Sequence, residues 1–259
     1  MPDTLHGAPL LPHSPKSPLP ILLLHGGKIS SRWYSHQITH LTHTHPHRPI
    51  IALDTRAHGR STDDLSLPLS YALFASDVVA LLSHLNVPRV AVIGWSDGAN
   101  TALQILMSPS YSSLIERAFL FGANYRPDQL NVTGLLGIPF LADLAGRMQS
   151  EYEVVKPAKG AWEVFKGRMD AMQGVLPTWG EGDFGGIKTL YEDERGAPIV
   201  WFTDGAEEEI VLRRVVGDMK GMVRGSSLVL LPDVGHFAPL QDPGTFNAML
   251  DRWLARARG

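Results

Sequence analysis

Two side chains in this sequence have the chemistry and the setting to activate a hydroxyl group together. Ser96 lies in the segment Gly-Trp-Ser-Asp-Gly at 94–98, and His236 lies near the end of the chain in Gly-His-Phe at 235–237. A serine hydroxyl is a weak nucleophile until a base removes its proton, and an imidazole can do this near neutral pH. The pattern predicts Ser96 as a nucleophile and His236 as its base.

Such a base also needs a carboxylate that orients the imidazole and stabilises its protonated form. Asp204, Glu207 and Glu208 lie between Ser96 and His236 in the chain, just beyond the apolar run 198–203. Acidic residues in this place are also ordinary partners of a helix N-terminus. The residues by themselves leave the choice among the three open.

A cluster of histidines offers the alternative of a metal site. His36, His40 and His43 recur at a helical spacing, and His45 and His47 follow directly. No Asp, Glu or Cys lies among them to complete a ligand set. We therefore expect no metal and no other cofactor.

Short apolar runs indicate strands, and apolar residues at helical spacing indicate helices, among the elements that position these residues. Strands are predicted at 20–24, 49–54, 90–93, 116–122, 198–203 and 227–231, and helices at 31–44, 71–85, 209–223 and from Phe246 onward. Ser96 then falls between a strand and a helix, in a turn so tight that its middle residue is displayed above the sheet. Gly94 and Gly98 let this turn close, because a Cβ at either position would collide with a neighbouring element.

The pattern changes between Asn124 and about Lys188, where strand signals disappear. Short helical patterns at 135–148 and 158–172 alternate with Gly and Pro, and aromatic and methionine side chains are frequent. We expect 124–188 to form a helical lid whose side chains line a substrate pocket, with the glycine-rich stretch 180–186 as a hinge. Residues 1–123 and 189–259 would then form the core.

Composition excludes several classes of partner. The chain has 259 residues, a formal net charge of −3 and no cysteine. No apolar run approaches the ~20 residues that cross a bilayer, and the proline-rich start does not have the form of a signal peptide. We expect a cytoplasmic protein that acts on a small molecule and binds neither nucleic acid nor membrane.

Four stretches carry a family likeness: LLLHGG, DTRAHGRS, GWSDGA and PDVGHFAPLQDP, in this order. With them the sequence resembles the α/β-hydrolase fold superfamily over almost its whole length, in particular its esterase, lactonase and carbon–carbon bond hydrolase branch. The resemblance implies an α/β fold with a mostly parallel central sheet flanked by helices. It also implies a small helical lid inserted after the sixth strand, and an N-terminal hairpin for which the proline-rich start looks too short.

The resemblance assigns roles to single residues as well. It implies Ser96 as nucleophile, His236 as base, and the backbone N–H groups of Gly27 and Asp97 as the oxyanion hole. The family's acid-bearing loop aligns best on Glu208, with Glu207 second and Asp204 close by. Substrate-pocket residues are expected at Trp95, Phe237 and Asn124.

The predicted reaction is hydrolysis of a small carboxylic ester or lactone through an acyl-enzyme. Hydrolysis of a carbon–carbon bond in a β-diketone-like substrate would use the same residues. A member of the fold that binds a ligand without turnover is the third alternative.

Overall fold

The central sheet has six parallel strands. The computed structural model describes residues 18–131, 139–189 and 197–256. The strand order is β2-β1-β3-β4-β5-β6. The strands are β1 (Ile21–Leu24), β2 (Ile50–Leu53), β3 (Val90–Trp95), β4 (Ile115–Phe121), β5 (Ile199–Gly205) and β6 (Ser227–Leu231). Every predicted strand is confirmed, and because all are parallel, the segments that follow them meet at one edge of the sheet.

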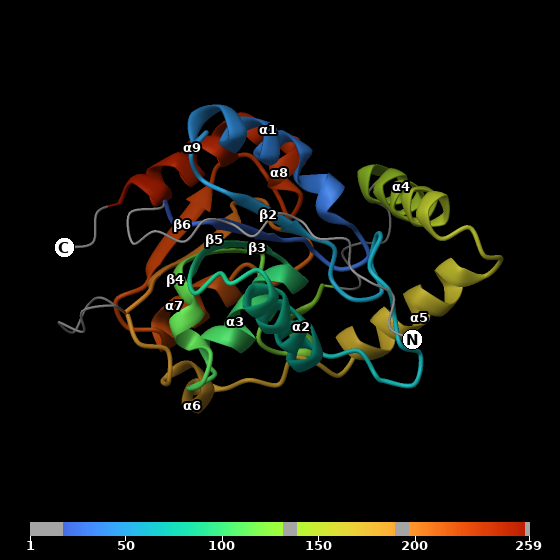
Figure 1. Cartoon of the computed structure of the whole chain (residues 1–259), viewed down its shortest axis with the longest axis horizontal. Helices are drawn as coiled ribbons and strands as arrows, with labels where there is room; N and C mark the ends of the chain where they lie inside the picture. Colours follow the sequence, from blue (N-terminus) through green and yellow to red (C-terminus); the bar gives the residue numbers. More distant parts are fainter. Residues whose placement is uncertain (1–17, 132–138, 190–196, 257–259) are drawn as a thin grey trace.

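Helices cover both faces of the sheet (Figure 1). One face carries α1 (Ser35–Thr44), α8 (Ala238–Gln241) and α9 (Pro243–Ala255). The other carries α2 (Tyr71–His84), α3 (Asp97–Leu106) and α7 (Val215–Met222). Short 3₁₀ helices lie at η1 (Ser31–Tyr34), η2 (Ser112–Leu114) and η3 (Pro127–Gln129).

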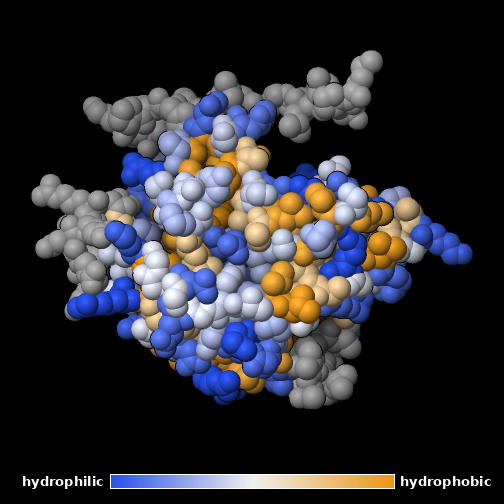
Figure 2. Space-filling view, turned by 90° about the horizontal axis from the view of Figure 1, so that it is seen from below, coloured by the Kyte–Doolittle hydropathy of each residue, from blue (hydrophilic) through white to orange (hydrophobic). Residues whose placement is uncertain are grey.

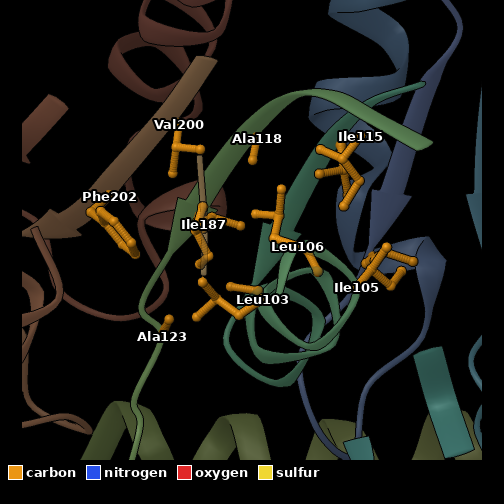
Figure 3. Packing of buried hydrophobic residues seen from close by; sticks show 14 of the residues in the cluster. Leu103, Ile105, Leu106, Ile115, Ala118, Ala123, Ile187, Val200 and Phe202 are labelled. Carbon is orange, nitrogen blue, oxygen red and sulfur yellow. The ribbon is translucent and has the colours of Figure 1, made fainter. Parts of the chain in front are cut away.

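Alternation along the strands builds a separate core on each face. In β1, Leu22 and Leu24 pack with residues of α2, α3 and α7, whereas Ile21 and Leu23 pack with residues of α1 and α9. Figure 3 shows the first of these cores, where α3 packs against the sheet. Burial on both faces holds the sheet rigid, and the site residues lie at its carboxyl edge.

The segment between β4 and β5, which we call the cap (residues 124–188), includes residues 132–138 that lie outside the described residues, among them the start of the predicted helix 135–148. It contains α4 (Pro139–Val155), α5 (Ala161–Gln173) and the short α6 (Glu181–Phe184), and α4 and α5 lie together at one side of the molecule (Figure 1). A third apolar cluster joins it to the core: Trp162, Phe165, Met169 and Met172 of α5 pack with Ala57, Leu69, Tyr71 and Phe74.

The cap follows the fourth described strand, not the sixth. The N-terminal hairpin that the resemblance implies concerns residues 1–17, which are outside the described residues. The glycine-rich stretch 180–186, which we expect to act as a hinge, is not an irregular loop throughout. It forms α6, whose Phe184 is fully buried against Tyr125 and Trp179.

The helix predicted at 209–223 begins only at Val215. The residues before Val215 are not helical, because the N–H groups of Ile210 and Val211 donate to the Glu208 carboxylate. Val211 also forms a bridge to Leu130 at the start of the cap. The loop after β5 is thus fixed by a side chain instead of by helical hydrogen bonds.

The surface mixes polar and apolar residues on the face that Figure 2 shows, with hydrophobic patches among hydrophilic side chains. Among the residues that the structure describes, no helix combines the length and hydropathy that a bilayer-spanning segment needs.

Candidate active site

Ser96 occupies a strained turn between β3 and α3. Its backbone has φ 55° and ψ −120°, a left-handed conformation that costs a non-glycine residue energy. The two flanking glycines are confirmed as steric requirements. A Cβ on Gly94 would lie 2.6 Å from the Ala99 Cα, and one on Gly98 would lie 2.0 Å from the Leu24 carbonyl oxygen.

The His236 ring lies against the end of β4. The backbone of Ser96 forms a hydrogen bond to the residue just before this point. The Ser96 N–H donates to the Phe121 carbonyl at 2.7 Å. A Cβ on the following residue, Gly122, would lie only 2.7 Å from Cε1 of the His236 ring. The backbone of Ser96 and the ring of His236 thus each lie at the end of β4, on the adjacent residues Phe121 and Gly122.

Glu208 is the acid that contacts the imidazole. Its carboxylate oxygens lie 2.9 and 3.0 Å from Nδ1 of His236, and both side chains are almost fully buried. Burial raises the pKa of Glu208, but the His236 charge and hydrogen bond outweigh this and lower it to about 2. Burial lowers the pKa of His236, and Glu208 more than reverses this, so that it ends above its ordinary value. The pair therefore has an ionised acid that favours a protonated imidazole.

The two competing acids have other surroundings. Glu207 is exposed and pairs with Arg213 at 2.7 Å. Asp204 is buried, and burial together with the charge of Glu208 holds its pKa well above the usual range. The neighbouring Glu209 accepts the backbone N–H of His236 at 2.9 Å, a contact that the sequence did not indicate.

The loop after β1 faces the start of α3. Gly27 lies so close to Asp97 that a Cβ on it would be 2.3 Å from the Asp97 Oδ2. Asp97 is the first residue of α3, where N–H groups lack helical partners and the helix dipole favours negative charge. The role of the Gly27 and Asp97 N–H groups as an oxyanion hole stays a prediction.

Two buried histidines fix this loop against the turn after β2. His25 lies 2.7 Å through Nδ1 from the Gly26 carbonyl and accepts the Thr55 N–H through Nε2. His58 lies 2.8 Å through Nδ1 from the Arg56 carbonyl and accepts the Lys28 N–H through Nε2. Burial lowers the pKa of both rings, so both are neutral and each can donate with one nitrogen and accept with the other. The turn after β2 thus braces the loop after β1.

The three predicted pocket residues are packed tightly. Trp95 is 1% exposed, and its Nε1 donates to the His236 carbonyl at 2.8 Å. Phe237 stacks edge-on against the Trp95 ring, and Asn124 shares two hydrogen bonds with Asn100. None of the three lines the cavity described next, and their role as pocket residues stays a prediction.

A cavity of about 310 Å³ lies between the cap helix α4, the residues after the Gly27 loop, and the turn after β2. This volume is at the lower end for small-molecule sites. Its walls are Lys28, Ile29, Ser30, Arg32, Trp33, Asp54, Gly59, Arg60, Met148, Glu151, Tyr152 and Val155.

Two histidines of the cluster contact a carboxylate of α9. Nε2 of His40 and Nε2 of His45 lie 2.8 and 3.0 Å from the two carboxylate oxygens of Asp251 in α9. Within the described ranges, no group of three or more His, Cys, Asp or Glu side chains is arranged to hold a metal ion. The carboxylate absent from the local sequence thus comes from a distant helix and contacts two of the histidines.

Sequence reasoning missed three residues around Asp97. Tyr71 donates to Oδ1 of Asp97 at 2.7 Å, Gln173 donates to Oδ2 at 2.8 Å, and Lys28 donates to Gln173 at 2.9 Å. Tyr71 and Gln173 come from two different helices, and no local motif signals such a contact.

Comparison with known proteins gives short sequence matches. The chain is 42% identical over 59 residues to an esterase/lipase of Haemophilus influenzae, which covers 23% of this chain and 20% of that protein. It is 35% identical over 77 residues to the serine hydrolase BPHL of Homo sapiens, covering 29% and 26%. The chain thus spans only about a fifth to a quarter of the length of these curated relatives.

Solved structures match over the full fold. An enol-lactonase from Burkholderia xenovorans has a TM-score of 0.68 at 19% identity, with 94% of both chains covered. A meta-cleavage product hydrolase from Pseudomonas fluorescens has a TM-score of 0.69 at 15% identity, with 92% of this chain and 90% of that chain covered. The model of the alpha/beta hydrolase family matches residues 21–249, and the chain belongs to this family.

Proposed function

We propose that this protein is a serine hydrolase that cleaves a small carboxylic ester or lactone, with Ser96 as nucleophile, His236 as base and Glu208 as acid. The contact between Nδ1 of His236 and the Glu208 carboxylate carries the proposal. It leaves Nε2 of the same ring available for the serine proton. The strained backbone of Ser96, beside the same strand end, is the second support.

The reaction follows from these positions. Nε2 of His236 takes the Ser96 proton as Oγ attacks the substrate carbonyl carbon, and a tetrahedral intermediate with an oxyanion forms. When the carbon–oxygen bond to the leaving alcohol breaks, the imidazolium returns its proton to that alcohol. A water molecule, deprotonated by the same imidazole, then attacks the acyl-enzyme and releases the acid. In a lactone, acid and alcohol leave as one molecule.

The N–H groups of Gly27 and Asp97 serve as the oxyanion hole in this proposal. Both are backbone donors on fixed elements, so they need no rearrangement when charge develops. The loss of one such donor costs roughly 3 kcal/mol in comparable sites. Glu208 is ionised and fully enclosed, which suits the stabilisation of the imidazolium that forms in each step.

Turnover of a panel of substrates tests the proposal. p-Nitrophenyl acetate, p-nitrophenyl butyrate, γ-butyrolactone and a β-diketone are offered to the wild type, Ser96→Ala and His236→Ala. Ester or lactone hydrolysis that both variants lose supports the proposal. Cleavage of only the β-diketone would instead indicate a carbon–carbon bond hydrolase, and ligand binding without any turnover would indicate a binding protein.

A further inference from the structure

A side chain of the cap, Gln173 at the end of α5, contacts both segments that carry the proposed oxyanion hole. Its Nε2 donates to the Asp97 carboxylate at 2.8 Å, and its Oε1 accepts from Nζ of Lys28 at 2.9 Å. Asp97 and Lys28 belong to the two separate segments that carry the proposed oxyanion donors. The amide of Gln173 therefore joins both halves of the hole.

The amide cannot be exchanged for a simpler group without losing one of these contacts. A lysine ammonium only donates, and a carboxylate only accepts. A group between them must accept on one side and donate on the other, as a glutamine amide does. A Cβ on Gly27 would lie 2.6 Å from the Gln173 Nε2, which shows how closely the amide covers the loop.

Other contacts fix each partner of Gln173. Lys28 also forms an ion pair with Asp170, one turn earlier on α5, at 2.6 Å. The backbone of Lys28 has a φ of 62°, and its N–H is held by His58. Asp97 is 7% exposed, and its second oxygen accepts from Tyr71. The chain Lys28–Gln173–Asp97–Tyr71 thus runs from the loop after β1 through the cap to α2.

We propose that Gln173 is a positioning residue that couples docking of the cap helix α5 to the geometry of the oxyanion hole. With α5 docked, the spacing between the Gly27 and Asp97 backbones is fixed by the amide. When α5 moves away, the buried carboxylate of Asp97 loses a hydrogen-bond donor. The loop after β1 then loses its connection to α3 through Gln173. The inference rests on the proposed function for the identity of the hole, but the tie itself is a property of the fold.

Gln173→Leu tests the coupling because it keeps the side-chain size and removes both contacts. We expect kcat for p-nitrophenyl butyrate to fall roughly 10- to 100-fold, since small misplacements of catalytic groups have effects of this size. KM should change less than about twofold, because the amide acts through the donors and not on the bound ground state. Gln149→Leu on α4 is the matched control, since its amide contacts only Glu153 of its own helix in the described residues. It should keep kcat within about twofold.

Gln173→Glu separates the two contacts. Its carboxylate can still accept from Lys28 but faces the Asp97 carboxylate with like charge, so cap docking through Lys28 is kept while the tie to Asp97 is lost. We expect kcat to fall by a similar factor. A normal kcat in both Gln173 variants, in an enzyme whose turnover depends on Ser96, would overturn the inference and leave the proposed function standing.

Hydrogen exchange gives a readout that does not depend on turnover. In Gln173→Leu, peptides covering 26–34 and 95–99 should exchange roughly tenfold faster than in the wild type, while a peptide from α9 is unchanged. Unchanged exchange in the first two peptides would overturn the coupling. A wild type without Ser96-dependent turnover but with this exchange pattern would refute the proposed function alone.

Discussion

Replacement of Glu208 by glutamine tests the acid most sharply. The change keeps the shape of the side chain, but the amide has only one acceptor oxygen in place of two. That oxygen is already needed by the N–H groups of Ile210 and Val211, which both donate to Oε1 of Glu208. The amide NH₂ then faces Nδ1 of His236, which must become an acceptor. The ring is thereby held in the tautomer whose Nε2 carries the proton and cannot take one from Ser96.

The size of the effect follows from this wrong tautomer. The corresponding exchange of acid for amide in a serine protease lowers kcat about 10⁴-fold, which is about 5.5 kcal/mol of transition-state stabilisation. The structure supports a loss of that order, because the Glu208 side chain is fully enclosed and no water can replace it. Stability should change little, since volume and both backbone contacts are kept.

Two matched variants make the comparison decisive. Glu207→Gln removes an exposed charge that only pairs with Arg213, so kcat should be unchanged. Asp204→Asn replaces a carboxyl whose pKa is raised by burial and by the charge of Glu208 with a neutral group of the same shape, and it leaves the contact between Glu208 and His236 in place, so kcat should fall less than about tenfold. Steady-state hydrolysis of p-nitrophenyl butyrate measures all three. A nearly active Glu208→Gln beside an inactive Asp204→Asn would refute the assignment.

Three further predictions concern the surroundings of the site. Gly122→Ala places a Cβ 2.7 Å from Cε1 of His236, at a residue whose backbone φ is +64°. Because the His236 ring would have to shift, kcat/KM should fall roughly 100-fold. A kcat/KM near that of the wild type would show that the ring is free to move. Because Glu208 raises the pKa of His236 above 6.5, kcat/KM should decline as the pH falls through a midpoint above 6.5, and a lower midpoint would contradict that coupling. Met169→Ala empties a fully buried position of the cap cluster, which should cost about 2–5 kcal/mol in urea unfolding. A loss below about 1 kcal/mol would mean that the cap does not unfold together with the core.

The strands and the turn at Ser96 could be predicted because their signals are local. Apolar runs such as Ile21–Leu24 and Val90–Trp95 are buried on both faces of the sheet and contain few competing patterns. The two glycines around Ser96 are required by contacts inside a single strand–turn–helix unit. Sequence spacing reports such contacts directly.

The loop after β5 could not be predicted in the same way. Residues 209–214 have a helical pattern, yet tertiary contacts hold them in another conformation: Glu208 binds two of their N–H groups, and Val211 pairs with Leu130. The same contacts distinguish Glu208 from the other two candidate acids, Asp204 and Glu207. The local sequence pattern could not distinguish the three. The family resemblance favours Glu208, and of the three candidates it is Glu208 whose carboxylate contacts the His236 ring.

The polar contacts of the cap could not be predicted from the sequence either. Gln173 reaches Asp97 from a helix far away in the sequence, and Asp251 completes contacts with His40 and His45 in the same manner. A lone glutamine or aspartate on a helix carries no periodic signal. Only the packing of α5 and α9 onto the core reveals what these side chains touch.

The most direct measurement is the rate at which a fluorophosphonate labels the protein, followed by mass-spectrometric location of the label. The account predicts rapid modification of Ser96 in the wild type and a rate at least roughly 10²-fold lower in folded His236→Ala, because the imidazole supplies the base. Equal rates in the two proteins, or a label on any other residue, would contradict the claim that His236 activates Ser96.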